Sequence, residues 1–507
     1  MISKFQSFWL VLVAAFCIVL LAGCGDTFRQ FITPVPGPTG DPGALSHAVV
    51  TSTNPAPAGL GSDMHVDVSG DSLAGNVTLG HDPLFFNSNQ GRAFIVNGDG
   101  TVSLYTGLLP LTTAVNTATL PPTTSGAIAA SAGNNGGIYV ANSGSNDVSF
   151  IPLTTTAVTQ VIPTGLNPVM VAGGGNSAKI YVVNHGDNTV TVISTIDNTF
   201  QKTIPVGSQP VWAVMSSDGE AVFVVNQGDG TLSFIDTSVD QEICGSGGSI
   251  VACTPANRIH VGSSPNFAFY DSPRRRVYVT NTGSNNISLI NANGINFGVT
   301  PPVLPTFVAN IAVTGSPISV SALHDGSKVY AALANCTDPA TNHTNLQGHL
   351  PNCNGNLVSV IDTIALAQTK TITVGPGAVS VDSSADSSRA YVVSAHDTTT
   401  IKDNMHNPNC TMAPCTTTGG PCIALPCLPG APLPDRTFPT TPSVSIIRTG
   451  TDTVLRYTTD PSVPTLVPSF LTPPQDPNCK AALDNNFNKS VAIPCVGQIP
   501  FMVRVIP

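Results

Sequence analysis

The sequence predicts an all-β protein built from a turn-rich repeated unit, and three features of its composition support this. The 29 Asp and Glu and 19 Lys and Arg are only 9% of the 507 residues, against about 25% in an average soluble domain, which argues against a solvated helical bundle. The 46 glycines and 43 prolines favour turns. The chain is nevertheless 41% hydrophobic, too much for a disordered polymer.

The N-terminus has the features of an export signal. Lys4 precedes an apolar stretch, Phe8 to Leu21, that is too short for a membrane span. The stretch ends in Leu21-Ala22-Gly23-Cys24, which resembles the lipobox of bacterial lipoproteins. This resemblance implies that residues 1–23 are a signal peptide and that Cys24 is lipidated. The alternative is an unmodified, buried Cys24 at the end of an N-terminal helix.

Residues 24–63 are predicted to be a tether, because they are rich in Pro and Gly and such a composition stays extended and solvated. Acyl chains on Cys24 would anchor the protein without a spanning helix. We therefore expect an extracytoplasmic protein, and by analogy with lipoproteins in which Asp does not follow the lipidated Cys, one in the outer membrane or at the cell surface.

A repeated motif organises the rest of the chain. An aromatic-Val-x-Asn strand is followed by an x-Gly turn, a second strand rich in Val, Ile and Leu, a third strand, and a corner that ends in Gly and Pro. The motif begins at Tyr139, Tyr181, Phe223 and Tyr278, with weaker copies at Phe94, Tyr330 and Tyr391. Four short strands in about 42 residues are typical of a β-propeller blade. Residues 64–507 are therefore predicted to form a single seven-bladed β-propeller of four-stranded blades.

The Tyr-Val-x-Asn strand, the Asn-x-Gly turn and the Val-Gly-x-x-Pro corner resemble the YVTN repeat of bacterial and archaeal surface β-propellers. The resemblance covers about Gly75 to Leu455. It implies the fold but no particular chemistry, because related propellers include surface-layer proteins, lactonases and parts of periplasmic redox enzymes.

The Asn of the motif is predicted to be a turn residue rather than a ligand, because Asn tolerates the left-handed conformation of tight hairpins. It is replaced by Leu333 and Ser394 in the two units where a long insertion replaces the hairpin. His185 and Asp187 occupy turn positions that Gln227 and Asp229 fill in the next unit, so they are also interpreted as turn residues.

Spacing of the repeat locates four insertions. Two lie between the third and fourth strands of their units, at about 242–257 and 291–310. Two larger ones lie between the second and third strands, at about 335–356 and 395–442. Loops of the second kind open on the face where the chain crosses to the next blade. The two larger insertions are therefore expected side by side on that face, and the smaller two on the other.

Closure of the ring has two candidate strands. The segment Val77 to Pro83 matches the fourth-strand corner but precedes the first complete unit, so it is predicted to add an outer strand to the last blade, beside strands near 444–447 and 454–457. The alternative is that Phe501 to Ile506 closes the ring.

Ten of the 12 cysteines remain after Cys17, in the signal, and Cys24 are set aside, and they are expected to form disulfides in an oxidising compartment. The alternative, zinc bound by the four in the largest insertion, is disfavoured because their spacings differ from zinc knuckles. The cysteines are the neighbours Cys244 and Cys253, Cys336 and Cys353, and Cys479 and Cys495, and the cluster Cys410, Cys415, Cys422 and Cys427.

The residues that most resemble ligands lie in the two larger insertions: His343, His349, His396, Asp397 and His406. Their spacing does not match a rigid metal site, so they are predicted to face a partner and to hold no metal. No haem attachment motif, hydrolase elbow or phosphate loop is present, so no cofactor is predicted.

These observations favour a binding or display scaffold over an enzyme. We expect a protein or glycan partner at the face with the larger insertions. Nucleic acid is not expected, because the net charge is −10 with no basic block. The alternative function is a propeller-type hydrolase or lactonase with its site at the mouth of the axial channel.

Overall fold

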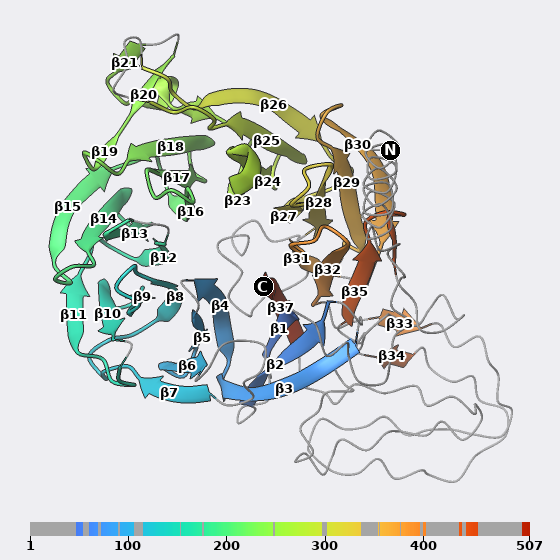
Figure 1. The fold of residues 1–507 in the computed structure, drawn as a ribbon, viewed down its shortest axis with the longest axis horizontal. Coiled ribbons are helices and arrows are strands. Elements are labelled where there is room, and N and C mark those ends of the chain that lie inside the picture. Colours follow the sequence, from blue (N-terminus) through green and yellow to red (C-terminus); the bar gives the residue numbers. More distant parts are fainter. Residues whose placement is uncertain are drawn as a thin grey trace, which may run out of the picture.

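The computed structural model describes residues 47–53, 60–68, 72–89, 92–105, 115–152, 154–174, 177–246, 249–296, 302–335, 353, 355–375, 377–395, 399–401, 436–438, 443–454 and 499–506. These residues form a closed ring of eight four-stranded blades around a central axis (Figure 1). The β-propeller prediction is confirmed, but the predicted number of seven blades is wrong.

Each blade is an antiparallel sheet whose four strands are arranged in order from the central axis to the rim (Figure 1). Blade 1 contains β37 (Ile499–Ile506), β1 (His47–Thr53), β2 (Leu60–Asp67) and β3 (Ser72–His81). Blade 2 contains β4 (Pro83–Asn89), β5 (Arg92–Asn97), β6 (Thr101–Tyr105) and β7 (Val115–Thr119). Blade 3 contains β8 (Ala127–Ala132), β9 (Ile138–Asn142), β10 (Asp147–Ile151) and β11 (Gln160–Pro163). Blade 4 contains β12 (Pro168–Ala172), β13 (Lys179–Asn184), β14 (Thr189–Ser194) and β15 (Phe200–Pro205).

The second half of the ring carries the insertions. Blade 5 contains β16 (Pro210–Met215), β17 (Ala221–Asn226), β18 (Thr231–Asp236) and an outer strand in two parts, β19 (Gln241–Glu242) and β22 (Ile259–His260). Blade 6 contains β23 (Pro265–Asp271), β24 (Arg276–Asn281), β25 (Asn286–Asn291) and β26 (Thr306–Ala312). Blade 7 contains β27 (Pro317–Ala322), β28 (Lys328–Leu333), β29 (Leu357–Asp362) and β30 (Ala367–Thr373). Blade 8 contains β31 (Ala378–Ser383), β32 (Arg389–Ser394), β35 (Ser443–Arg448) and β36 (Thr453–Val454).

Two hairpins and two short 3-10 turns lie outside the blades. The hairpins are β20 (Cys244–Ser246) with β21 (Ser249–Val251), and β33 (Thr399–Ile401) with β34 (Arg436–Phe438). The 3-10 turns are η1 (Pro255–Asn257) and η2 (Ser272–Arg274).

Blade 1 closes the ring by combining the two ends of the chain. The last strand, β37, pairs antiparallel with β1, so that His47 lies opposite Ile506. The prediction that Val77 to Pro83 adds an outer strand beside 444–447 is wrong, because Val77 to His81 belong to β3 of blade 1 and Pro83 begins β4 of blade 2. The alternative, closure by the C-terminal strand, is correct. Strand β1 begins at His47, so it lies within the segment expected to be a tether.

Both faces of each sheet are buried because every blade packs between two neighbours. Strand β13 shows this alternation. Tyr181 and Val183 belong to one hydrophobic cluster, whereas Ile180 and Val182 belong to another. All four side chains are fully buried. Alternating apolar residues on both faces explain why a sequence so poor in charge folds as stacked sheets.

The motif Asn links the second and third strands of its blade. Asn226 is fully buried, and its Nδ2 donates to Thr231 Oγ1 (3.0 Å) and Ser233 Oγ (2.9 Å). A Cβ on Gly207, at the corner of the preceding blade, would lie 2.4 Å from Asn226, which explains why that corner requires Gly. Equivalent bonds are made by Asn97, Asn142, Asn184 and Asn281.

This Asn is therefore structural, as predicted, but for a different reason. The residue with a positive φ lies four positions later, as Asn146 (59°), Asn188 (60°) and Asn285 (50°) show. The prediction for Asp187 holds, because its carboxylate accepts from Thr189 Oγ1 (2.7 Å) and from the backbone N–H of Leu166 (3.0 Å).

The motif aromatic residue makes a second link, to the next blade. Tyr181 Oη donates to Asp240 of blade 5 over 2.7 Å, and Lys179 Nζ lies 2.7 Å from the same carboxylate. Asp240 occupies the left-handed position (φ 52°) of the turn between the third and fourth strands. The arrangement recurs for Tyr330, Lys328 and Asp452, and, with Asn as acceptor, for Tyr139 and Asn198.

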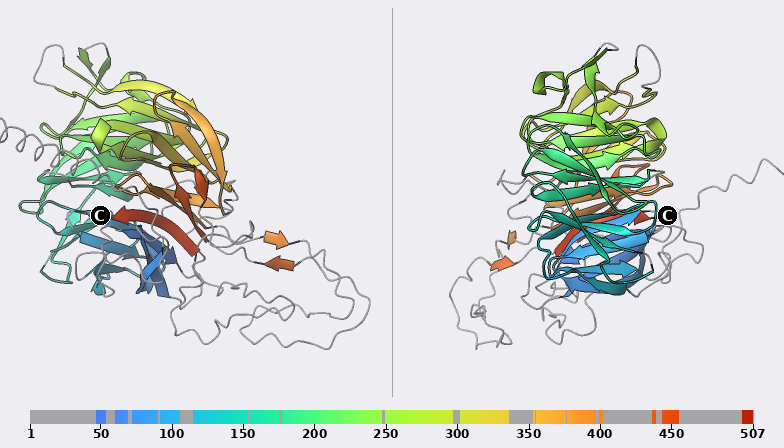
Figure 2. Two further views of the ribbon diagram at one scale, coloured as in Figure 1. Left: turned by 45° about the vertical axis from the view of Figure 1, so that its right-hand side comes forward. Right: turned by 90° about the vertical axis from the view of Figure 1, so that its left-hand side faces the viewer.

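The ring has two faces with different turns. We call the face with the turns between second and third strands and the crossovers between blades the crossover face, and the other the base face. The insertions of blades 7 and 8, 334–356 and 395–442, leave the ring at the crossover face. The insertions of blades 5 and 6 follow third strands and leave from the base face, as predicted. Figure 2 shows β33 and β34 on one side of the ring and the end of β37 on the other.

Candidate binding face and buried polar sites

The larger insertions start and end next to each other on the crossover face. The backbone N–H of Ala378 donates to Gly355 O (2.9 Å), at the end of the blade 7 insertion. The N–H of Ala395, at the start of the blade 8 insertion, donates to Gly377 O (2.8 Å). One dipeptide at the start of blade 8, Gly377-Ala378, therefore contacts both insertions where they join the ring.

A buried cysteine holds the blade 7 insertion to this junction. Cys353 is disulfide-bonded and only 2% exposed. It belongs to the same hydrophobic cluster as Ala378 and Ala395. The end of the insertion is thus packed into the ring before β29 begins.

Most of the predicted site residues lie outside the described residues. These are the lipidation site Cys24, the candidate ligand residues His343, His349, His396, Asp397 and His406, and the cysteines Cys336, Cys410, Cys415, Cys422, Cys427, Cys479 and Cys495. The structure places the junctions of the two insertions together but does not describe these side chains. Their grouping remains a prediction.

The blade 5 insertion is held by covalent and ionic links. Cys244 and Cys253 form a disulfide, with Cα atoms 5.1 Å apart. Arg258 donates from Nε and Nη2 to the two carboxylate oxygens of Glu242, at 2.7 and 2.9 Å, and both side chains are at least 92% buried. A bidentate pair of this kind fixes geometry as well as charge. It joins the two parts of the split outer strand, β19 and β22.

Glu242, Cys244 and Cys253 are close enough to share a metal ion. Both sulfurs are, however, in the disulfide, and both carboxylate oxygens accept hydrogen bonds from Arg258. This group is therefore a structural brace.

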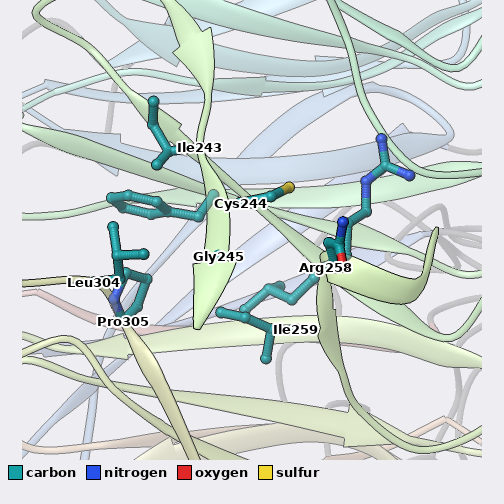
Figure 3. A pocket seen from close by; sticks show the side chains of 10 residues that line it. Ile243, Cys244, Gly245, Arg258, Ile259, Leu304 and Pro305 are labelled. Atoms are coloured by element: carbon teal, nitrogen blue, oxygen red, sulfur yellow. The ribbon is translucent and has the colours of Figure 1, made fainter. Parts of the chain in front are cut away.

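A small cleft lies beside this brace. Figure 3 shows Ile243, Ile259, Leu304 and Pro305 around Gly245, with Arg258 at one side. Its free volume of about 10 Å³ is close to the room one water molecule needs. The cleft is thus a packing gap between the insertions of blades 5 and 6 and is too small for a substrate.

The interface between blades 1 and 2 contains a buried polar cluster that the sequence analysis missed. Tyr105 Oη lies 2.5 Å from Asp63 Oδ2 and 3.1 Å from His65 Nε2. Asp63 and His65 are two positions apart in β2, so both side chains lie on the same face of this strand, and Tyr105 contacts them from β6. Strand β1 adds His47 and Thr51 to the same face, opposite Asp67 and Asp63. We call Asp63, His65 and Tyr105 the seam triad.

Burial shifts the titration of the seam triad. Burial raises the pKa of Asp63 to about 7, against hydrogen bonds from Thr51 and Tyr105 that lower it. Burial, with a smaller contribution from His47, lowers the pKa of His65 to about 4. Burial and the Asp63 carboxyl also raise the pKa of Tyr105. The triad is thus held in its uncharged form between pH 4 and 7.

One signal in the sequence could have revealed this cluster. In Ser62-Asp63-Met64-His65-Val66-Asp67, polar residues alternate with apolar ones, and the same period of two places His47 and Thr51 on one face. In a protein with so few charged residues, two acids and a histidine on one strand face are unusual.

Comparison with known proteins supports the fold and no specific family. No family model and no curated protein matches the chain. The dihydro-heme d1 dehydrogenase NirN in complex with DHE matches over 83% of this chain and 74% of its own, at 11% identity and a TM-score of 0.54. The β-propeller domain of Myceliophteria_thermophila Cps50 (Swd1) matches 62% of this chain and 94% of its own, at 10% identity and 0.45. Hydrazine synthase of Kuenenia stuttgartiensis matches 62% of this chain and 92% of its own, at 16% identity and a TM-score of 0.44.

The similarity to NirN supports a shared β-propeller fold and nothing further, because only 11% of residues are identical. The resemblance to the YVTN repeat therefore rests on the motif residues of this chain. Among the described residues, no helix has the length and hydropathy needed to cross a bilayer.

Proposed function

We propose that this protein is a lipid-anchored, extracytoplasmic β-propeller that binds a protein or glycan partner through the crossover face of blades 7 and 8. The observation that carries the proposal is the shared junction at Gly377-Ala378, from which both large insertions leave the ring. Two long loops that start side by side can form one continuous surface, and such loops on a rigid scaffold are where binding residues concentrate.

The regular blades strengthen this argument. Blades 3 to 6 join their second and third strands by turns of four residues, such as His185 to Asn188. Blade folding therefore does not require the 48 residues between β32 and β35, 395–442. A long loop that the fold can dispense with, and that carries four cysteines, is best explained by recognition.

A loop exchange tests the binding role. Residues 395–442 are replaced by the four-residue turn His185-Gly186-Asp187-Asn188, and a matched control replaces the blade 6 connection, 292–305, by the four-residue turn Thr237-Ser238-Val239-Asp240. The immobilised proteins are compared for retention of purified envelope proteins and glycans. We expect the first variant to lose binding of the partner and the control variant to keep it. Both variants should still unfold cooperatively on heating. Equal retention by both variants would refute a binding role for this loop.

The anchor is tested separately. Cys24→Ser should release the protein from membranes into the soluble extracytoplasmic fraction, because the anchor consists only of the acyl chains on this residue. Cell fractionation measures this, and unchanged membrane retention would contradict it.

A further inference from the structure

Several large hydrophobic side chains are exposed on turns and strand ends of the base face. Ile196 is 83% exposed and Ile364 is 92% exposed, and both lie at the tips of turns between third and fourth strands. Val239 lies in the equivalent turn of blade 5 and is 51% exposed. We call Ile196, Val239 and Ile364 the base tips. Phe200, Phe307 and Val308, at the base-face ends of their outer strands, are 44–49% exposed.

The base tips are not explained by the fold. The same turn can be closed with small polar residues, as Thr449 to Asp452 show in blade 8. An almost fully exposed Ile contributes little to the stability of its own blade, since it removes little apolar surface from water. The three base tips come from separate blades but lie on one face of the ring, so they can contact one flat apolar surface together.

The chain enters the ring on this same face. Strand β1 runs from His47 at the base face to Thr53 at the crossover face, antiparallel to β2. The segment from Cys24, residues 24–46, therefore joins the described fold at His47, on the base face. These 23 residues span at most about 80 Å. The base face is thus the face that carries the attachment point of an anchor on Cys24.

We propose that the base face docks on a zwitterionic lipid surface through the base tips. The proposal rests on the proposed lipid anchor at Cys24. Three apolar tips bind a bilayer weakly by themselves, but a tether of this length keeps them at a high effective concentration beside it. The crossover face and its two insertions then point away from the membrane, toward a partner.

Charge decides which lipid surface fits. Asp197 directly follows Ile196 and is exposed, and Glu220, also exposed, lies in a neighbouring turn of the base face. Arg274 and Arg275, in the same region, pair with Asp271 and Asp218. Lys179 and Lys328, at the base-face ends of their strands, are also paired with carboxylates, so most of the cations described on this face are already matched by acids. Docking should weaken, rather than strengthen, when anionic lipid is added.

Tryptophan fluorescence can test this orientation. The sequence contains Trp9, in the predicted signal peptide, and Trp212, which is 4% exposed, so the mature chain has a single buried tryptophan. Tryptophan is introduced separately as Ile196→Trp, Ile364→Trp and, as the matched control on the crossover face, Leu166→Trp, whose parent residue is 55% exposed. Each lipidated full-length mature protein is reconstituted into phosphatidylcholine vesicles that contain brominated phosphatidylcholine.

We expect a blue shift and at least twofold stronger quenching at positions 196 and 364 than at 166. In a Val239→Trp protein, the added changes Ile196→Ser and Ile364→Ser should reduce quenching at 239. Equal quenching at all positions, or strongest quenching at 166, would overturn the docking proposal.

Flotation of the vesicles separates the two proposals. Protein that floats without quenching at 196 and 364 retains the anchor and refutes docking. Protein that does not float refutes the anchor; docking is then measured after coupling a maleimide lipid to Cys24, and absence of quenching at 196 and 364 in that sample refutes docking as well.

Discussion

The joint between blades 4 and 5 and the joint between blades 1 and 2 hold neighbouring sheets together with different chemistry. The first uses Tyr181, Lys179 and Asp240, a charged group at the edge of the ring where the lysine is 28% exposed. The second uses the seam triad, in which Asp63 and His65 are buried without a charged partner. The joint between blades 4 and 5 thus tolerates charge at the rim, whereas the joint between blades 1 and 2 buries its polar groups.

The largest effect is expected from removing β37, the strand that closes the ring within blade 1. Deletion of residues 499–507 exposes the edge of β1 and removes the buried Met502 and Val503. We predict loss of the cooperative melt measured by circular dichroism. The control, Thr78→Ala, changes an exposed side chain of β3 in the same blade and should retain the melt. A deletion protein that melts like the parent would show that the ring closes without β37.

The pH dependence of stability next distinguishes the joint between blades 1 and 2. Asp63, with its pKa raised to about 7, contributes stability that is complete below pH 4 and is lost as the pH rises to 7. His65, with its pKa lowered to about 4, contributes stability that is present above pH 6.5 and is lost as the pH falls to 4. In the parent protein these two effects cancel between pH 4 and 6.5.

Single substitutions remove the cancellation. Asp63→Asn should lose about 3 kcal/mol of unfolding free energy on going from pH 6.5 to 4, and His65→Gln should lose a similar amount from pH 4 to 7. Urea unfolding at five pH values measures both slopes. Profiles parallel to that of the parent would show that these residues do not exchange protons on folding.

The tyrosine of the seam triad should matter more than an ordinary motif tyrosine. Tyr105→Phe removes the hydroxyl that both Asp63 and His65 contact, and leaves two buried polar groups without it. We predict a loss of about 2–3 kcal/mol in unfolding free energy, since each unsatisfied buried group costs about 1–3 kcal/mol. A loss below about 1 kcal/mol in urea unfolding would contradict the role given to the triad.

The smallest effects on stability are expected from two motif tyrosines, one at the joint between blades 4 and 5 and one at the joint between blades 6 and 7. Tyr181→Phe loses one hydrogen bond to Asp240 and should cost about 1 kcal/mol. Tyr278→Phe should cost close to nothing, because the equivalent residue of the next blade is Leu366, which offers no acceptor side chain. Equal losses for the two variants in the same unfolding experiment would show that the hydroxyl of Tyr181 does not contribute through Asp240.

The sequence allowed prediction of the propeller fold because each repeated unit carries its own local signals. The Asn226 and Gly207 motif positions recur at fixed spacing, and the insertions appear as excess length between them. Blade 1 escaped prediction for two physical reasons. Its second strand reads Val49-Val50-Thr51-Ser52, without the aromatic residue or the Asn, and its inner strand comes from the other end of the chain. Pairing between residues more than 400 positions apart produces no repeated pattern in the sequence.

The candidate site was predictable only in its position. The gaps in the repeat placed two insertions on one face, and the contacts of Gly377 and Ala378 show that their junctions adjoin. The seam triad was missed because its members come from strands 40 positions apart, and only the assembled ring shows that Tyr105 reaches Asp63.

The pairing of His47 with Ile506 also means that the ring has no unique beginning. A short linker between these two residues would turn blade 1 into a hairpin like that of every other blade. The chain could then be opened at any regular turn, for example after Gly186, to give a circular permutant with the same eight sheets. In such a permutant, the place where the protein is tethered could be moved around the ring or to its other face without altering a single blade.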